Sequence, residues 1–164
     1  MSLDTIVSCA TGFDAGYVTV TGGEPLAQTQ TPGLLTALCD AGFREVSLET
    51  SGALDISTVD PRVVKVMDLK TPGSGEVERN CYENILYLGR RDQVKFVLCD
   101  RADYDWAKEC LTEYSLVSRC EVLFSPAADQ LRSATLADWI LEDRLAVRFQ
   151  LQLHKFLWGN EPGR

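Results

Sequence analysis

Short runs of β-branched and other apolar residues recur along this chain, each followed by polar residues or glycine and then by a stretch with helical periodicity. The expected strands are residues 17–21, 45–49, 63–69, 93–98, 121–124 and 147–153. The expected helices are residues 4–9, 31–42, 80–88, 102–117 and 136–145. Strands that alternate with helices at such intervals are typical of βαβ units and a parallel sheet. The pattern therefore predicts an α/β fold with mostly parallel strands, built as a single domain over residues 1–164.

The stretch from Gly16 to Leu26 (GYVTVTGGEPL) is the most informative part of this pattern. It predicts a short buried strand over residues 17–21 that runs into two glycines, a carboxylate and a proline. The glycines end the strand and leave backbone groups free at its carboxyl end. Because parallel α/β folds bind ligands at the carboxyl ends of their strands, we expect Glu24 and the neighbouring backbone at a ligand site.

The other expected strands also end in polar residues, namely Thr50, Ser51, Asp68, Lys70, Ser125, Gln152 and His154. Their convergence on one edge of the sheet indicates a site for a polar small molecule. Each residue taken singly has a structural explanation as well. The glycine pair can be a turn, Ser51 a cap, Asp68 and Lys70 a surface ion pair, and His154 a packed histidine.

Charge and cysteine spacing exclude several classes of protein. The formal net charge is −8 without a basic patch, so no nucleic-acid partner is expected. No apolar run is long enough to cross a membrane, and we expect a cytoplasmic protein. The six cysteines form no C-x-x-C pair, so we expect reduced thiols rather than a metal site built from them alone. Dinucleotide, P-loop and nucleophile-elbow motifs are missing.

A set of motifs in a fixed order is similar to the 7-carboxy-7-deazaguanine synthase family of radical S-adenosylmethionine (SAM) enzymes. The motifs are GGEP (22–25), LETSG (48–52), MDLKTPGSGE (67–76), VKFVLCDRADYDW (94–106), LFSP (123–126) and FQLQLHK (149–155). The resemblance extends from about Gly16 to the C-terminus and implies a partial (β/α) barrel of the radical SAM type. An activating enzyme for a glycyl radical protein is the alternative within the superfamily, and the motifs at 67–76 and 149–155 favour the pterin enzyme.

The resemblance implies a lyase reaction, in which 6-carboxy-5,6,7,8-tetrahydropterin becomes 7-carboxy-7-deazaguanine with loss of ammonia. It implies SAM, a [4Fe–4S] cluster and Mg²⁺ as cofactors, the pterin as substrate, and an external electron donor. The cluster reduces SAM to a 5′-deoxyadenosyl radical, while the protein holds SAM and pterin in register.

The family's binding residues can be carried over to matching positions of this chain. The resemblance implies that Gly22, Gly23 and Glu24 hold the SAM ammonium group, and that Ser51, Thr50 and Lys70 contact the SAM carboxylate or ribose. It assigns Thr21, Gly23 and His154 to the pterin. Ser125 and Gln152 are weaker candidates for the adenosine side of SAM. No catalytic residue and no metal ligand is expected within this chain.

The chain departs from the family's pattern upstream of Gly22. The family carries a C-x-x-x-C-x-x-C motif or a longer-spaced variant there, with a preceding strand and an Asp-Thr pair that serves Mg²⁺, whereas this chain has only Cys9. A truncated chain is the favoured explanation, and a natural non-catalytic relative that binds SAM or pterin without a cluster is the alternative. We expect no cluster and no radical activity from the polypeptide as printed. We also expect an unpaired strand edge beside residues 17–21 and therefore a homodimer.

Overall fold

A parallel sheet with six strands forms the centre of residues 1–159, which the computed structural model describes apart from the side chains of residues 154–156. The strands are β1 (Tyr17–Val20), β2 (Glu45–Thr50), β3 (Val64–Asp68), β4 (Gln93–Leu98), β5 (Glu121–Pro126) and β6 (Arg148–Phe149). They lie in sequence order, and each pairs in parallel with the next. Parallel strands in sequence order are the arrangement of a (β/α) barrel, and over the described residues the sheet does not close, which confirms the predicted class of a partial barrel.

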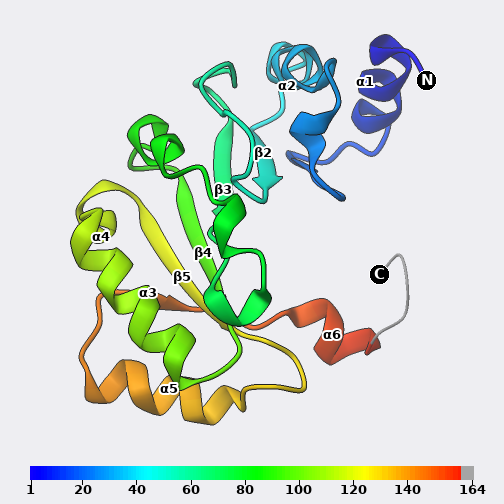
Figure 1. Ribbon diagram of the computed structural model, residues 1–164. Coiled ribbons are helices and arrows are strands. Elements are labelled where there is room, and N and C mark those ends of the chain that lie inside the picture. Colours follow the sequence, from blue (N-terminus) through cyan, green and yellow to red (C-terminus); the bar gives the residue numbers. More distant parts are fainter. Residues whose placement is uncertain (160–164) are drawn as a thin grey trace.

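Helices connect most of the strands. They are α1 (Leu3–Thr11), α2 (Thr31–Asp40), α3 (Arg101–Glu113), α4 (Leu116–Arg119), α5 (Ser133–Glu142) and α6 (Leu153–Trp158), with 3₁₀ turns η1 (Pro25–Ala27), η2 (Pro72–Ser74), η3 (Val77–Arg79) and η4 (Tyr82–Tyr87). The chain follows an arc from α1 and α2 at one end to α3, α4 and α5 at the other, with α6 apart from them (Figure 1). Among the described residues, none of the helices combines the length and apolarity that a membrane crossing requires.

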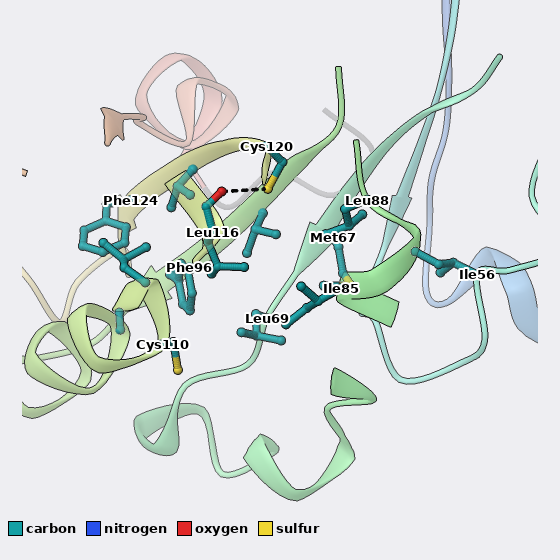
Figure 2. Packing of buried hydrophobic residues seen from close by; sticks show 14 of the residues in the cluster. Ile56, Met67, Leu69, Ile85, Leu88, Phe96, Cys110, Leu116, Cys120 and Phe124 are labelled. Carbon is teal, nitrogen blue, oxygen red and sulfur yellow. Dashed lines mark hydrogen bonds between the residues drawn. The ribbon is translucent and has the colours of Figure 1, made fainter. Parts of the chain in front are cut away.

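The hydrophobic core lies between one face of the sheet and the helices. Alternate residues of β4, namely Val94, Phe96 and Leu98, are fully buried, as period-two alternation predicts. Phe96 packs edge-on against Phe124 of β5, with their ring centroids 5.5 Å apart. Figure 2 shows this cluster continuing through Met67 towards Ile56. The opposite face carries polar side chains such as Glu49, Asp68 and Lys95 together with apolar ones such as Val66 and Leu123.

A buried ion pair joins β3 to the turn before β4. Lys65 Nζ lies 3.2 Å from Asp92 Oδ2, and the two side chains are only 8% and 7% exposed. Asp92 also accepts hydrogen bonds from the backbone N–H groups of Lys65 and Gly89, at 2.8 and 2.7 Å. The carboxylate therefore anchors the amino-terminal ends of two adjacent strands, away from the edge that carries the predicted site.

Two strand predictions are corrected by the structure. The strand over 17–21 is not buried, because β1 is an edge strand whose residues are exposed or half-buried. The final strand, expected over 147–153, is reduced to Arg148–Phe149, and the chain then turns into α6. The alternating pattern of residues 147–153 is too short and too weakly buried to distinguish the two structures.

Three helix predictions also differ from the structure. The helix expected over 102–117 is divided into α3 and α4, because Ser115 adopts a left-handed conformation with φ 51°. The segment expected to be a helix over 80–88 is the 3₁₀ helix η4. The helix expected over 136–145 begins three residues earlier and ends at Glu142. Boundaries of this kind depend on local turns that periodicity does not report.

Replacing Asp92 should destabilise the protein more than replacing Lys65. Asp92→Ala leaves a buried ammonium group and two backbone N–H groups without their acceptor, so we expect a loss of about 3–5 kcal/mol in the free energy of unfolding. Lys65→Met leaves the carboxylate with both backbone donors, and we expect a smaller loss of about 1–3 kcal/mol. Urea unfolding of both variants measures the difference. Equal losses, or a larger loss for Lys65→Met, would contradict this account.

Candidate functional site

The chain leaves β1 through two glycines in left-handed conformations. Gly22 has φ 104° and Gly23 has φ 52°, values that side chains other than glycine rarely adopt. A Cβ atom added at either position would meet no atom within 4 Å, so the glycines are required by backbone conformation rather than by crowding. The backbone of this turn therefore faces open space at the carboxyl end of β1.

Glu24 then ties this turn to the end of β2. Its Oε2 accepts hydrogen bonds from the Ser51 backbone N–H at 2.8 Å and from the Ser51 hydroxyl at 2.5 Å. The Thr50 hydroxyl lies 3.0 and 2.9 Å from the two carboxylate oxygens. Oε1 also accepts the Leu26 N–H at 3.0 Å and so caps η1. The carboxylate thus accepts its hydrogen bonds from the protein itself and links the turn after β1 to the end of β2. We call this set of hydrogen bonds from Leu26, Thr50 and Ser51 to Glu24 the buckle.

The protonation of Glu24 follows from these contacts. Burial is the largest single influence and raises the pKa of the carboxyl group, but the hydrogen bonds from Ser51, Leu26 and Thr50 together outweigh it. The net pKa of Glu24 is lowered below its ordinary value of 4.5. Glu24 is therefore ionised near neutral pH, which is the state in which it can accept all of these hydrogen bonds.

A small polar cavity of about 120 Å³ lies at the ends of the first four strands. Its walls are formed by Thr21, Gly23, Glu49, Thr50, Ser51, Val66, Asp68, Lys70 and Lys95. Lys70 Nζ contacts Asp68 Oδ2 at 2.6 Å. The other oxygen of Asp68, Oδ1, is buried without a hydrogen-bond partner in the described part of the chain. The cavity therefore presents ammonium groups and a spare carboxylate acceptor side by side.

Two asparagine side chains, one buried and one half-buried, hold the two loops that border this cavity. Asn84, which is fully buried, donates to the carbonyl groups of Gly52 and Leu54 at 3.0 and 2.8 Å and accepts the Ile56 N–H at 3.1 Å. Asn80 accepts the Lys70 N–H at 2.9 Å and donates to the Lys70 carbonyl at 2.8 Å. The side-chain amide of each asparagine thus fixes its loop by donating to backbone carbonyl groups and accepting from a backbone N–H group.

The structure brings most of the predicted site residues together. Thr21, Gly23, Thr50, Ser51 and Lys70 line the cavity, and Gly22 and Glu24 form the adjoining turn and buckle. These positions are compatible with the predicted roles, which remain predictions. The predicted ion pair between Asp68 and Lys70 is present and belongs to the cavity.

Three predicted residues lie elsewhere or cannot be placed. Gln152 lines a separate hollow of about 470 Å³, formed mainly by residues 126–133 after β5. Ser125 is fully buried at the end of β5, and its hydroxyl has no hydrogen-bond partner among residues 1–159. His154 falls within α6, but its side chain is outside the described part of the structure.

Lys95 was missed as a site residue, and Glu49 and Asp68 were given no binding role. Glu49 accepts a hydrogen bond from the Thr21 hydroxyl at 3.2 Å, which joins the ends of β1 and β2. The signal for Lys95 was present in the sequence, because it alternates with Val94 and Phe96, which face the core. An ammonium group on the opposite face of a central strand can only point to the site side of the sheet.

The fold and this edge define the class of protein: a partial parallel (β/α) barrel with a polar cavity at the carboxyl ends of its strands. The chain is 46% identical to the 7-carboxy-7-deazaguanine synthase of Chlorobaculum tepidum, over 97% of this chain and 73% of that protein. It is 41% identical to the enzyme of the same name from Koribacter versatilis, over 89% of this chain and 70% of that protein. The chain belongs to the 7-carboxy-7-deazaguanine synthase family, as the order of its motifs predicted.

A solved structure supports the fold independently. The crystal structure of QueE from Escherichia coli matches with a TM-score of 0.69 at 20% sequence identity, over 93% of this chain. This chain spans 64% of the length of that one. No protein-family model matches the chain.

Replacing Glu24 tests the buckle. In Glu24→Gln, an amide N–H group would face the Ser51 or Leu26 donor, so we expect a loss of about 1–3 kcal/mol in the free energy of unfolding at pH 7. Because the pKa of Glu24 is lower in the folded protein, its contribution is fully present above about pH 4.5 and is lost as the pH falls further. The difference between wild type and Glu24→Gln should therefore shrink in acid. Urea unfolding from pH 7 to pH 3 measures it, and a pH-independent difference would contradict the role of an ionised buckle.

Proposed function

We propose that this chain provides the SAM- and substrate-binding part of a radical SAM lyase that converts 6-carboxy-5,6,7,8-tetrahydropterin to 7-carboxy-7-deazaguanine with loss of ammonia. Membership of the family supports the reaction. One structural observation carries the binding role. The cavity at the ends of β1–β4 combines open glycine backbone, an unpartnered carboxylate oxygen and lysine ammonium groups in one place.

These groups suit the amino-acid end of SAM, which carries an ammonium group and a carboxylate. The carbonyl groups of the Gly22–Gly23 turn and Asp68 Oδ1 can accept from the ammonium group, while Lys70 can donate to the carboxylate. The oxygens of Glu24 already make five contacts with donors of Leu26, Thr50 and Ser51. Glu24 therefore positions the glycine turn rather than contacting SAM itself. We therefore assign the direct contact to the backbone and the orientation of that backbone to Glu24.

The volume of the cavity fits this assignment. About 120 Å³ is smaller than the roughly 300–1,000 Å³ of a site that encloses a whole drug-sized ligand. The cavity can hold one end of SAM, and the adenosine would extend over the edge of the sheet. The hollow beside Gln152 is larger, at about 470 Å³, and is the available place for that part.

The metal cofactors of the family do not fit the described residues. Within residues 1–159, no group of three His, Cys, Asp or Glu side chains is placed to hold a metal ion, and the six cysteines are separate thiols. We therefore assign neither the [4Fe–4S] cluster nor Mg²⁺ to any residue of this chain. When bound, the cluster would supply the electron for SAM cleavage, and our proposal gives the described residues the binding and orientation of SAM.

The chain should distinguish SAM from 5′-methylthioadenosine, which lacks the amino-acid end. We expect calorimetric titration to show at least about tenfold tighter binding of SAM, equivalent to about 1.4 kcal/mol. Lys70→Met should remove most of this difference, because the ammonium group that meets the carboxylate is lost. Lys108→Met is the matched control, since Lys108 also pairs with an aspartate, Asp143, at 2.5 Å but lies on α3. Equal affinity for the two ligands, or an equal effect of both lysine variants, would overturn the proposed role of the cavity.

We also propose that the chain forms a homodimer through β1. This strand is an edge of the sheet, and Tyr17 on it and Phe13 before it are 59% and 82% exposed. An exposed strand edge with large apolar side chains is a ready template for pairing with another chain. A second copy presents the same edge, so a two-fold arrangement would cover both.

Light scattering over a concentration series tests this dimer. Wild type should shift from monomer towards dimer as concentration rises, and Phe13→Lys/Tyr17→Lys should stay monomeric, because lysine blunts an exposed edge. Leu141→Lys is the control, since Leu141 is 74% exposed but lies on α5. A wild type that remains monomeric at high concentration would contradict the proposal.

A further inference from the structure

The segment after β3, residues 69–76, places Lys70 at the cavity and is held from two sides. Asn80 binds the N–H and the carbonyl of Lys70, as described above. The second attachment follows immediately along the chain at Thr71, which is almost fully buried, and Gly73. It comes from Asp103, a residue of α3 that is distant from the cavity in sequence and does not line it.

Asp103 is 1% exposed, and its carboxylate accepts hydrogen bonds from the loop after β3 and from the turn after β4. Its Oδ2 accepts the Thr71 hydroxyl and the Cys99 N–H, each at 2.9 Å, and its Oδ1 accepts the Gly73 N–H at 2.7 Å. Its own N–H donates to Asp100 Oδ1 at 2.9 Å, which caps α3. One carboxylate thus joins the loop after β3, the turn after β4 and the start of α3.

The contact between Asp103 and Gly73 leaves no spare room. A Cβ atom on residue 73 would lie 2.6 Å from Asp103 Oδ2, so glycine is required there for close approach. None of the ion pairs found in the described part of the chain involves Asp103. A buried carboxylate without a cation is costly unless hydrogen bonds satisfy it, and here the donors belong to the loop that carries Lys70. The position of the loop and the stability of the carboxylate therefore depend on each other.

We propose that Asp103 is a positioning residue that fixes residues 69–76 and thereby sets where the Lys70 ammonium group lies in the cavity. Asp103 touches no ligand; it acts through Thr71 and Gly73. The part of the proposal that concerns ligand affinity rests on the proposed SAM site, whereas the part that concerns the loop does not.

Two measurements on the full chain test this role. In Asp103→Asn, amide hydrogen exchange at residues 70–75 and at Cys99 should accelerate at least tenfold, while exchange in β2 and β4 stays as in wild type. SAM affinity should fall by about as much as in Lys70→Met, and Asp103→Asn/Lys70→Met should bind no more weakly than Lys70→Met alone, because both changes remove the same contact.

Asp92→Asn is the matched control. Asp92 is another buried carboxylate that accepts two backbone N–H groups, but it lies at the opposite end of the strands. It should lower global stability without changing exchange at residues 70–75 or SAM affinity. If Asp103→Asn does not fold, Thr71→Val removes one arm of the contact and should produce the same pattern with a smaller amplitude.

Unchanged exchange at residues 70–75 in a folded Asp103→Asn would overturn the proposal. Faster exchange at these residues combined with wild-type SAM affinity would also overturn it, because the loop would then be released without any effect on the contact between Lys70 and SAM. If the wild-type chain binds no SAM, the proposed site fails, and the exchange data still decide whether Asp103 holds the loop.

Discussion

The contact of the Glu24 carboxylate with Thr50 and Ser51 is the interaction on which the candidate site depends. It joins the turn after β1 to the end of β2, and it does so through charged hydrogen bonds that need an ionised acceptor. β1 is an edge strand with little burial of its own, so its position relies on such contacts. Without the buckle, the open backbone of Gly22 and Gly23 would have no fixed relation to the lysine side chains across the cavity.

The same arrangement recurs one strand further along the sheet. Asn84 holds the loop after β2, while Asn80 and Asp103 hold the loop after β3. Asn84 and Asp103 are buried and Asn80 is half-buried, and all three bond to backbone groups of the loop that they hold, as buried polar groups in proteins generally do. The hydrophobic face of the sheet supplies most of the stability. The hydrogen bonds of these polar side chains fix the positions of the loops at the carboxyl ends of the strands. Asn80, Asn84 and Asp103 therefore fix the position of the cavity walls without lining the cavity themselves.

Much of the fold could be predicted from the sequence because its strands are buried on the core face. The strand at residues 93–98 was predicted with its exact bounds, since the buried residues Val94, Phe96 and Leu98 recur at every second position. Where burial is weak the prediction was wrong in part: β1 is present but not buried, and β6 is much shorter than expected. The break at Ser115 depends on one left-handed residue, which periodicity does not reveal.

The site was predictable only where its residues follow strands directly. Thr21, Gly23, Thr50, Ser51 and Lys70 were found in this way, whereas Lys95 lies within a strand and Asp103 acts from a helix. The most direct test of the site is a titration of the isotope-labelled chain with SAM, followed by backbone amide NMR shifts. We predict the largest shifts at residues 21–24, 49–52 and 68–73. Shifts confined to the outer face of α3, or none at saturating SAM, would contradict the account.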